Sequence, residues 1–510
     1  MPRLAACEIG GAEVVVSGTM PHTKLVCTLG PASADRIPAL IEAGMSVARL
    51  NFSHGTEADH RHAAAAVRQA ATALGRPVAL LADLPGPKVR LGELVRGVIT
   101  LRDGARLLIR GHDAPGDETV ISTSHPDLAA DLVAGDRVLL ADGAVELRVV
   151  ASGDLLTTEV VRGGTVRSGA GVNIPSERLT LPAITDRDRR ALEVALSIGV
   201  DLVAQSFVRR AADLVHLRAL LGRHRVGLVA KLETRAAVED LEAILTRADA
   251  VMVARGDLGV EIPYEEIPLV QKRIVAMAVA AGRPVIVATQ MLESMTAHTR
   301  PTRAEASDVT TAVLEGADAV MLSAETAIGK HPIEAAEAAL RICAFAEANG
   351  AAYETRLERT RPLPRPVIDE QPRPPAAGAL AGDSEEDAEQ RAAWAVAGAA
   401  AELADREPDV GALACYTTSG RTAALLAAAR PHKPIMALSA DPIVVRRLAL
   451  YRGVTAGHAE QPADTESVVS LIDREVRQIT GLVAGRSVVI VAGSPVGHAL
   501  TNVLRVHRLE

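Results

Sequence analysis

The chain has 510 residues, of which 48% are hydrophobic, 23% are charged and only 2% are aromatic, and its formal net charge is −8. This length and apolar content predict several aliphatic cores, which excludes both a disordered chain and a single small domain. The negative charge, and the lack of a basic tract interleaved with aromatic residues, argue against a nucleic-acid-binding surface.

The sequence contains neither a recognisable membrane span nor a secretion signal. No apolar stretch approaches the roughly 20 residues that cross a bilayer, and the first 21 residues lack a charged segment followed by an apolar one. The four cysteines are far apart and form no C-x-x-C pair, as in a reduced protein. We therefore predict a cytoplasmic protein with no membrane or nucleic-acid partner and a short N-terminal extension over residues 1–21.

Between Lys24 and Ser323 the chain repeats a short β-prone run followed by a helical segment. Most runs are apolar without strict alternation, as in parallel strands that are covered on both faces. Eight such units close naturally into a (β/α)₈ TIM barrel. An open doubly wound sheet is the alternative, but no G-x-G-x-x-G motif favours it. The predicted strands are 24–29, 46–50, 78–82, 202–205, 226–230, 250–253, 285–288 and 319–322.

Polar residues stand just after these runs. In such barrels the carboxyl ends of the strands carry the chemistry, so the repeat predicts that these side chains surround a single site. They are Asn51, Asp83, Ser206, Lys231, Asp257, Thr289 and Ser323.

Three other parts of the chain break the barrel repeat. Short β-like pieces (106–109, 137–140, 145–150 and 158–161) predict a small inserted β-barrel domain that forms a lid over the rim. A proline-rich and then acidic stretch predicts a solvated linker. A second α/β pattern, with apparent strands at 412–416, 435–438 and 488–491, predicts a C-terminal open-sheet domain. The predicted boundaries are 22–86 and 184–355 for the barrel, 87–183 for the lid, 356–390 for the linker and 391–510 for the last domain.

The segments Lys231-Leu-Glu233 and Arg255-Gly-Asp257 both follow apolar runs. One ammonium and two carboxylates at one rim suit a divalent cation held beside a phosphoryl group. A surface salt bridge between loops is the simpler alternative. The glycine-containing turn after Asp257 offers backbone N–H groups to an anion.

Further oxygen and cationic groups follow the second and third runs. Asn51, Ser53 and Asp83 offer hard oxygen ligands to a monovalent or divalent cation, and Arg49 offers a forked donor to a phosphate. Capping of the next helix is the alternative role for Asn51 and Ser53. Thr289 can donate or relay a proton, or cap a helix.

In the last domain, a run of hydroxyl-bearing residues joins a strand to an alanine-rich helix. Such a turn makes either an effector-type phosphate pocket or an ordinary helix cap. Its residues are Thr417, Thr418, Ser419, Gly420, Arg421 and Thr422.

Several long segments in the same order resemble the pyruvate kinase family, over nearly all of residues 22–510. They are KLVCTLGPAS (24–33), MSVARLNFSHG (45–55), KLET (231–234), MVARGDLGVEIP (252–263), ATQMLESM (288–295), RPTRAEASDV (300–309), TTSGRTA (417–423) and NVLRVHRL (502–509). The resemblance implies Mg²⁺-dependent transfer of the phosphoryl group of phosphoenolpyruvate to ADP, giving pyruvate and ATP in glycolysis, with Mn²⁺ as a substitute metal.

The resemblance also implies a role for each matching rim residue. Lys231 would neutralise charge on the transferring group, Glu233 and Asp257 would hold Mg²⁺, and Arg49 would bind the substrate phosphate. The amides of Gly256 and Asp257 would bind the substrate carboxylate, and Thr289 would help to protonate the enolate. The positions that match nucleotide contacts are Asn51, Phe52, Ser53, His54 and Arg90.

The chain departs from the family pattern at Leu84-Pro-Gly-Pro-Lys88, where many members read Thr-Lys-Gly-Pro-Glu. A lysine there resembles the potassium-independent branch, because a fixed ammonium can replace a bound cation. We therefore expect that K⁺ is not required. The positions that match the K⁺ site of other members are Asn51, Ser53, Asp83 and Leu84.

Two more departures concern the nucleotide and the lid. Ala170 stands where a nucleotide-binding lysine is usual, and Ala141-Asp142-Gly143 replaces a turn with two adjacent acids. They leave open an alternative, a catalytically weakened paralogue that binds phosphorylated metabolites. A lyase on the same barrel, with an enolate–metal site, is a third possibility.

The resemblance further implies a homotetramer with an effector site at residues 417–422. The single tryptophan, Trp394, precedes the later loops of the last domain. This disfavours a fructose-bisphosphate effector relative to a monophosphorylated sugar or nucleotide.

Overall fold

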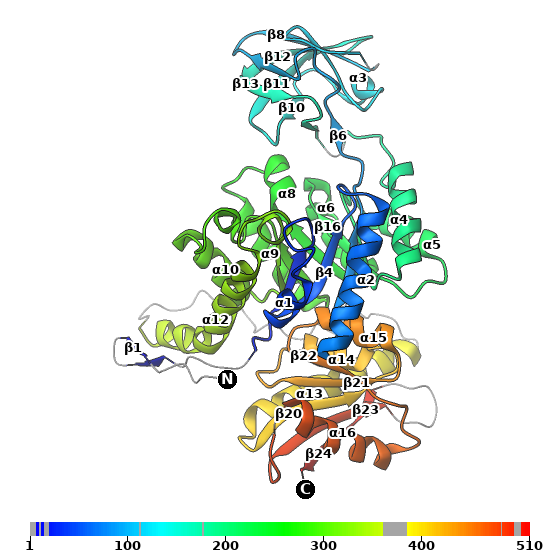
Figure 1. Cartoon of the computed structure of the whole chain (residues 1–510), viewed down its shortest axis with the longest axis vertical. Coiled ribbons are helices and arrows are strands. Elements are labelled where there is room, and N and C mark those ends of the chain that lie inside the picture. Colours follow the sequence, from blue (N-terminus) through cyan, green and yellow to red (C-terminus); the bar gives the residue numbers. More distant parts are fainter. Residues whose placement is uncertain are drawn as a thin grey trace.

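The computed structural model describes residues 7–9, 12–14, 20–111, 114–175, 178–360, 385–480, 482–493 and 501–509. Three folded parts lie along the long axis of the molecule, with the inserted β domain at one end, the barrel in the middle and the C-terminal domain at the other end (Figure 1). The chain forms the first three barrel strands, continues into the inserted domain and then returns to complete the barrel, as the sequence predicts.

Eight parallel strands form a closed barrel in the spatial order β15-β16-β17-β18-β19-β3-β4-β5. The predicted fold class is therefore confirmed, and each strand lies within two residues of its predicted position. Their bounds are β3 Lys24–Thr28, β4 Met45–Asn51, β5 Ala79–Asp83, β15 Leu202–Gln205, β16 Gly227–Leu232, β17 Ala250–Ala254, β18 Val285–Ala288 and β19 Ala319–Leu322.

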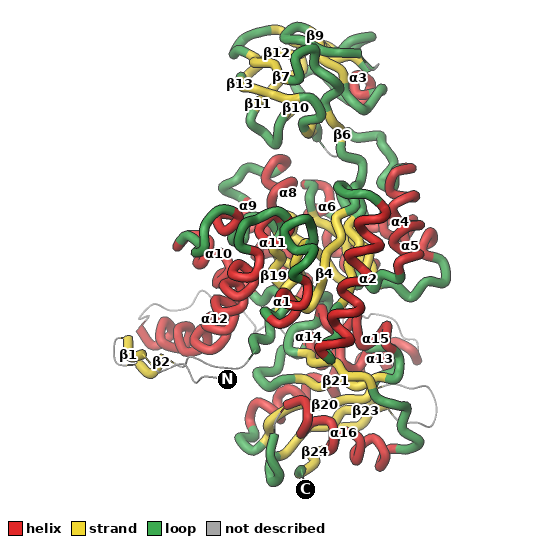
Figure 2. Tube along the Cα trace, in the orientation of Figure 1, coloured by secondary structure: helices red, strands yellow, loops and turns green. Residues whose placement is uncertain are grey.

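Helices cover the outside of the barrel (Figure 2). Three of them begin at a threonine that accepts a hydrogen bond from the backbone of the first turn in a capping box, namely Thr56, Thr185 and Thr302. The same three helices end at a glycine in the left-handed region. The bounds are α1 Ile37–Glu42, α2 Glu57–Leu74, α4 Asp186–Ile198, α5 Ala211–Leu221, α6 Arg235–Glu239, α7 Leu241–Arg247, α8 Arg255–Glu261, α9 Ile267–Ala280, α10 Arg303–Glu315, α11 Ala324–Ala327 and α12 Pro332–Thr360, with a 3₁₀ turn at Glu293–Thr296.

The inserted domain is a curled half-barrel sheet in the order β6-β14-β10-β11-β12-β8-β9, with a separate β7–β13 pair. The irregular spacing of its strands explains why five of them were not predicted. Their bounds are β6 Val89–Arg90, β7 Val98–Leu101, β8 Arg106–Arg110, β9 Val120–Ser122, β10 Arg137–Leu140, β11 Val145–Ala151, β12 Leu156–Arg162, β13 Gly164–Arg167 and β14 Gly171–Asn173, and helix α3 spans Leu128–Asp131.

The C-terminal domain is a mixed sheet in the order β22-β21-β20-β23-β24, in which the edge strand β24 is antiparallel to β23. The sequence predicted three of these strands and missed β22 and β24. The elements are α13 Glu385–Arg406, β20 Val410–Tyr416, α14 Arg421–Ala428, β21 Ile435–Ser439, α15 Pro442–Arg447, a 3₁₀ turn at Leu448–Leu450, β22 Val454–His458, α16 Thr465–Thr480, β23 Ser487–Gly493 and β24 Thr501–Arg508.

The predicted extension and linker are described in part. Cys7–Ile9 (β1) pairs antiparallel with Ala12–Val14 (β2) within the predicted extension. Helix α12 runs to Thr360 and α13 begins at Glu385, both inside the predicted linker, and residues 361–384 lie outside the described residues. Within the described part of the chain, no helix is both long and apolar enough to cross a membrane.

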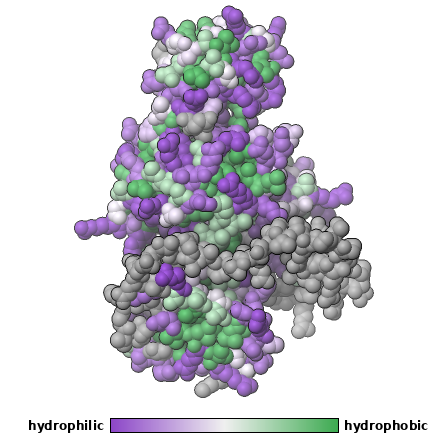
Figure 3. Space-filling model, turned by 180° about the vertical axis from the view of Figure 1, so that it is seen from behind, coloured by the Kyte–Doolittle hydropathy of each residue, from purple (hydrophilic) through white to green (hydrophobic). Residues whose placement is uncertain are grey.

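The barrel interior is an aliphatic core whose floor belongs to the C-terminal domain. Val26, Val229 and Ile286 of the strands share one cluster of buried side chains with Ala449 and Leu450 from the 3₁₀ turn of that domain. Ala449 and Leu450 thus seal the barrel at the end opposite the lid. On its outer surface, the C-terminal domain also exposes hydrophobic residues in the view from behind (Figure 3).

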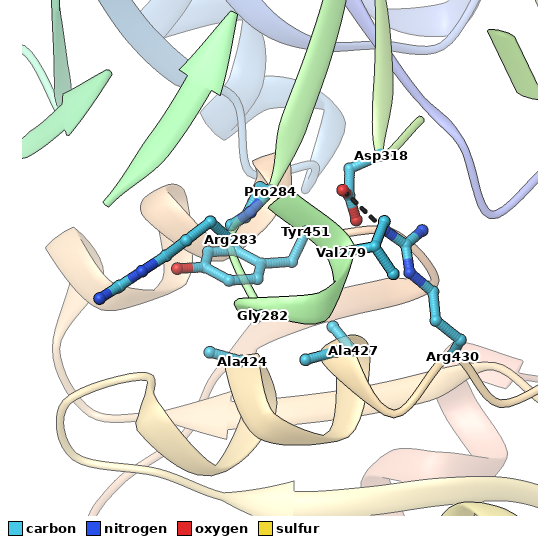
Figure 4. Close-up of a pocket in the computed structure, with 10 residues that line it drawn as sticks. Val279, Gly282, Arg283, Pro284, Asp318, Ala424, Ala427, Arg430 and Tyr451 are labelled. Carbon is cyan, nitrogen blue, oxygen red and sulfur yellow. Dashed lines mark hydrogen bonds and ion pairs between the residues drawn. The ribbon is translucent and has the colours of Figure 1, made fainter. Parts of the chain in front are cut away.

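Ion pairs surround this floor. Arg446 of the C-terminal domain bonds the buried Asp201 at 2.7 Å, and Arg430 bonds Asp318 at 2.9 Å. A small cavity lies between the two domains, lined by Gly282 of the barrel, Ala427 of α14, Tyr451 and the Arg430–Asp318 pair (Figure 4).

Lys24 lies between the barrel and the C-terminal domain and makes the stability of the protein depend on pH. Its Nζ donates to the backbone oxygen of Val454 at 2.7 Å, and burial lowers its pKa from 10.5 to about 8. Between pH 8 and 10.5 the unfolded chain therefore holds a proton that the folded chain has released, so stability rises with pH by about 1.4 kcal/mol for each pH unit. We expect the free energy of unfolding, measured by urea titration, to rise with pH in the wild type relative to Lys24→Met across this range. Replacement of the exposed Lys272 by methionine is the matched control, and an equal trend in both variants would contradict the assignment.

Candidate active site

The carboxyl ends of the barrel strands face the inserted domain, because the chain leaves β5 directly for that domain (Figure 2). Lys231 of β16 lies at this rim and is 8% exposed. Its Nζ lies 2.9 Å from Glu233 Oε1 and 3.2 Å from Asp83 Oδ1, and it donates to Ser206 Oγ at 2.7 Å. The predicted convergence of polar residues from three strands is thus present in the structure.

Arg49 adds a second cation to this cluster. Its Nε donates to Asp83 Oδ2 at 2.7 Å, and its Nη1 donates to Thr28 Oγ1 at 2.9 Å. Both carboxylate oxygens of Asp83 therefore face a cation, Arg49 on one side and Lys231 on the other. Burial would raise the pKa of Asp83, but attraction by Lys231 and then Arg49 outweighs burial and lowers it.

Lys231 and Glu233 form a buried pair, and burial and neighbouring charges shift the pKa of each. Burial would lower the pKa of Lys231, but Asp83 and then Glu233 attract the ammonium and hold the pKa above its usual value. Burial raises the pKa of Glu233, and repulsion from Asp257 adds to this effect. Glu233 Oε2 also accepts a hydrogen bond at 2.7 Å from the backbone N–H of Phe207, a residue in the left-handed region. A bound cation would stabilise this buried carboxylate, because burial outweighs the attraction of Lys231 and disfavours its charge.

Asp257 lies in the first turn of α8 and is paired with a cation that sequence analysis placed elsewhere. Lys88 Nζ lies 2.8 Å from Asp257 Oδ1 and 3.6 Å from Asp142 Oδ1 of the inserted domain. Burial opposes the charge of Lys88, but attraction by Asp257, then Asp142 and Glu233, raises its pKa on balance. Lys88, just before β6 of the inserted domain, thus links that domain to Asp257 at the barrel rim, and no local sequence pattern indicated this contact because the two residues lie 169 positions apart.

Thr289 ends β18 and contacts the start of α8. Its hydroxyl donates to the Ala288 oxygen at 2.6 Å and accepts from the Gly256 N–H at 2.9 Å. Thr289 has φ 67°, a left-handed conformation that a β-branched residue rarely adopts. Arg255, which sequence analysis quoted without a role, bonds the Thr289 oxygen and Asp308, and so fixes this turn.

The predicted nucleotide positions lie at the ends of β4 and β6. Asn51 Oδ1 accepts the Ser53 N–H at 3.1 Å in a local turn, whereas Thr56 caps the next helix, so the predicted capping role of Asn51 and Ser53 is wrong. Phe52 stacks on His60 with ring centroids 4.1 Å apart, whereas His54 is exposed. Arg90 Nη1 donates to the Gly169 oxygen at 3.0 Å, next to Ala170, which stands where the family resemblance implies a lysine.

The predicted K⁺ positions are neighbours, but Lys88 does not lie among them. Asn51 pairs with Asp83 across β4 and β5, and the Leu84 oxygen accepts the Ser206 hydroxyl at 2.7 Å. Asp83 is already matched by Arg49 and Lys231, as described above. The Lys88 ammonium instead contacts Asp257.

The hydroxyl-rich turn of the C-terminal domain lies between β20 and α14. Thr417 Oγ1 accepts the Gly420 N–H at 3.0 Å, and Ser419 Oγ accepts the Arg421 N–H at 3.4 Å. The Thr422 hydroxyl bonds that of Thr501 at 2.8 Å, and Thr418 is exposed. These contacts fix the turn, but none of its side chains caps α14, whose N-cap is Gly420, and the exposed Arg421 side chain lies at the edge of the turn.

The rim fits a divalent cation that is shared with a phosphorylated substrate. Within the described residues, no group of three or more His, Cys, Asp or Glu side chains is placed to hold a metal ion. Mg²⁺ needs fewer protein ligands than this, because it commonly binds one or two carboxylates together with substrate phosphates and water. Glu233 and Asp257, which repel one another across the rim, supply such a pair.

Fold and site together define a (β/α)₈-barrel protein with cationic and acidic side chains gathered at the carboxyl ends of its strands. Residues 20–336 match the family model described as "Pyruvate kinase, barrel domain", and residues 394–507 match "Pyruvate kinase, alpha/beta domain". The chain belongs to the pyruvate kinase family.

Individual relatives agree with this assignment. The chain is 43% identical to a pyruvate kinase of Mycobacterium tuberculosis, over 95% of this chain and 98% of the relative. It is also 43% identical to one of Corynebacterium glutamicum, over 96% and 98% of the two chains. The solved structure of a pyruvate kinase from Cryptosporidium parvum aligns with a TM-score of 0.83, at 32% identity and over 96% of both chains. The activity is that of a pyruvate kinase, phosphoryl transfer between phosphoenolpyruvate and ADP with formation of pyruvate and ATP.

Proposed function

We propose that the rim cluster around Lys231 is the catalytic centre of this pyruvate kinase, and that its side chains act as the family resemblance implies. The observation that carries the proposal is the row of close contacts at the carboxyl ends of the strands that joins Arg49 to Asp83, Asp83 to Lys231 and Lys231 to Glu233. Such fixed charges stabilise charge that develops during phosphoryl transfer without having to reorganise.

Each group then has one task. Arg49 binds the phosphate of phosphoenolpyruvate through the donors that Asp83 leaves free, and Lys231 balances charge on the transferring group and on the enolate oxygen. First-turn amides of α8 at Gly256 and Asp257 bind the carboxylate, since such amides lack an acceptor within the helix, and the Gly256 N–H exchanges the Thr289 hydroxyl for the substrate. Glu233 and Asp257 would hold Mg²⁺, which would supply further positive charge to the phosphoryl oxygens.

Thr289 is proposed to help protonate the enolate carbon. Its hydroxyl already donates to the Ala288 oxygen and accepts from Gly256, so its position is fixed by both bonds. On the other side of the rim, Asn51, Phe52, Ser53, His54 and Arg90 are proposed to contact ADP. Arg90 sits at the lid–barrel connection, where the nucleotide would lie beneath the inserted domain.

A coupled assay that follows pyruvate from phosphoenolpyruvate and ADP tests the function. Turnover at rates usual for kinases supports an active glycolytic enzyme. Binding of phosphoenolpyruvate without turnover would instead support the weakened paralogue, which Ala141 and Ala170 motivate. Consumption of substrate that does not depend on ADP would point to a lyase.

We expect the enzyme to work without K⁺. Lys88 supplies a fixed positive charge 2.8 Å from Asp257, and Asp83 is already balanced by Arg49 and Lys231. The initial rate should therefore change less than about twofold when KCl replaces tetramethylammonium chloride at constant ionic strength. In the Lys88→Met variant the rate should fall, because the rim loses a fixed positive charge. A wild type that is inactive until KCl is added would refute the expectation.

The remaining assignments concern the cell and the assembly. We propose a cytoplasmic homotetramer, and light scattering on the purified protein measures its mass. Exposed apolar side chains support association, namely Tyr264 (85% exposed), Leu269 (73%) and Val506 on the edge strand β24 (50%). We also propose that Thr417–Thr422, with Arg421 at its edge, binds a monophosphorylated sugar or nucleotide effector, which the same assay tests by addition of each compound.

A further inference from the structure

The tip of the lid is built to hold one carboxylate over the rim. Ala141, Asp142 and Gly143 join β10 to β11, and all three have positive φ, at 51°, 53° and 87°. Two of them are not glycine, so the turn adopts a conformation that such residues take at a cost in free energy. The turn is fixed by bonds from the Ala141 N–H to the Gly171 oxygen at 3.0 Å and from Arg162 to the Gly143 oxygen at 2.6 Å.

Lys88 lies directly beneath this tip. A Cβ atom added to Gly171 would lie 3.1 Å from Lys88 Cε and 3.3 Å from Asp142 Oδ1, so the glycine leaves room for both side chains. The Lys88 ammonium then lies between two carboxylates, 2.8 Å from Asp257 and 3.6 Å from Asp142. The two acids differ in exposure, with side chains that are 27% exposed in Asp257 and 73% exposed in Asp142.

The shared lysine makes the two acids interdependent. Asp257 is one of the two carboxylates proposed above to bind Mg²⁺, and a lysine bonded to it competes with a metal for the same oxygen. A lysine with a single partner could release that oxygen only by leaving its ammonium partly buried and unpaired, which is unfavourable. A second carboxylate within reach removes this penalty.

We propose that Asp142 is a positioning residue: the lid presents it as a second partner for Lys88, so that Lys88 can release Asp257 to the metal while remaining paired. This inference rests on the proposed metal-binding role of Asp257. It assigns a function to the strained turn and to the room at Gly171.

A double-mutant cycle on metal binding tests the proposal. Binding of Mn²⁺ to the full-length enzyme is measured by electron paramagnetic resonance of the free ion, without substrates. Asp142→Asn should raise the Mn²⁺ dissociation constant about fivefold, the scale of one exposed ion pair, and Asp142→Glu should restore binding to within about twofold. In a Lys88→Met background, Asp142→Asn should change the constant less than about twofold, because no lysine then holds Asp257.

The Lys88→Met background distinguishes the proposed exchange of partners by Lys88 from a general loss of negative charge near the metal site. An equal weakening by Asp142→Asn in both backgrounds would overturn the proposal, as would wild-type affinity in the single variant. Asp154→Asn, in the exposed turn between β11 and β12, is the matched control and should bind Mn²⁺ like the wild type. Failure of the proposed function would appear separately, as a wild type that binds Mn²⁺ but produces no pyruvate.

Discussion

Replacement of Lys231 by alanine is expected to lower kcat by about 10³-fold or more while the chain remains folded. The ammonium is the one group that contacts Asp83, Glu233 and Ser206 together, and it is almost completely buried. Its loss removes positive charge from the place where the phosphoryl group is transferred. Steady-state kinetics in the coupled assay, with circular dichroism of the purified variant, measure both parts of the expectation.

The same change should also reduce stability, because Asp83 and Glu233 lose the cation between them. Removal of one partner of a buried pair leaves an uncompensated charge, so the melting temperature should fall although the structure persists at 25 °C. Lys231→Arg keeps the charge and should recover stability better than activity, since the forked guanidinium cannot take the ammonium position. The exposed Lys272, changed to alanine, serves as control. Unchanged kcat in Lys231→Ala would remove this residue from the proposed mechanism.

Glu233→Gln is the second change with a large expected effect. Glutamine has nearly the same shape and can still accept the Phe207 N–H, but it lacks the charge that a metal requires. We expect kcat/KM to fall about 10²- to 10³-fold at ordinary Mg²⁺ concentrations, with partial recovery as Mg²⁺ is raised. The rate measured against Mg²⁺ concentration separates this loss from a loss of folding.

Two comparisons sharpen the interpretation of that variant. Glu239→Gln alters an exposed acid on α6, six residues along the chain, and should behave as wild type. Because burial, together with repulsion from Asp257, outweighs the attraction of Lys231 and disfavours a charged Glu233, the variant should unfold at a temperature no lower than the wild type. A Mg²⁺ dependence identical to that of the wild type would exclude Glu233 as a ligand.

The barrel could be predicted from sequence because its signals are local. Each strand is a short apolar run, as β18 (Val285–Ala288) illustrates, and each polar residue after a run falls at the same end of the barrel. The capping boxes at Thr56, Thr185 and Thr302 are likewise contained within four residues. The family resemblance then supplied roles for side chains whose proximity the repeat had already predicted.

The missed features depend on distant parts of the chain or on weak local patterns. Strand β22 (Val454–His458) contains threonine, glycine and histidine, and β24 (Thr501–Arg508) alternates charged residues with valines at an exposed edge. Neither is apolar enough to be read as a strand. The bond between Lys88 and Asp257 joins residues 169 positions apart, and no sequence signal distinguished it from a bond to the K⁺-site residues.

The floor of the barrel has a consequence for biosynthesis. The chain that emerges first from the ribosome contains all eight barrel strands, yet Ala449 and Leu450, which close the bottom of their core, are translated more than a hundred residues after β19. Until they arrive, the nascent cylinder is open to water at that end. Native packing of the catalytic part therefore has to wait for the domain that is proposed to receive the effector, so selection acts on both as a single folding unit.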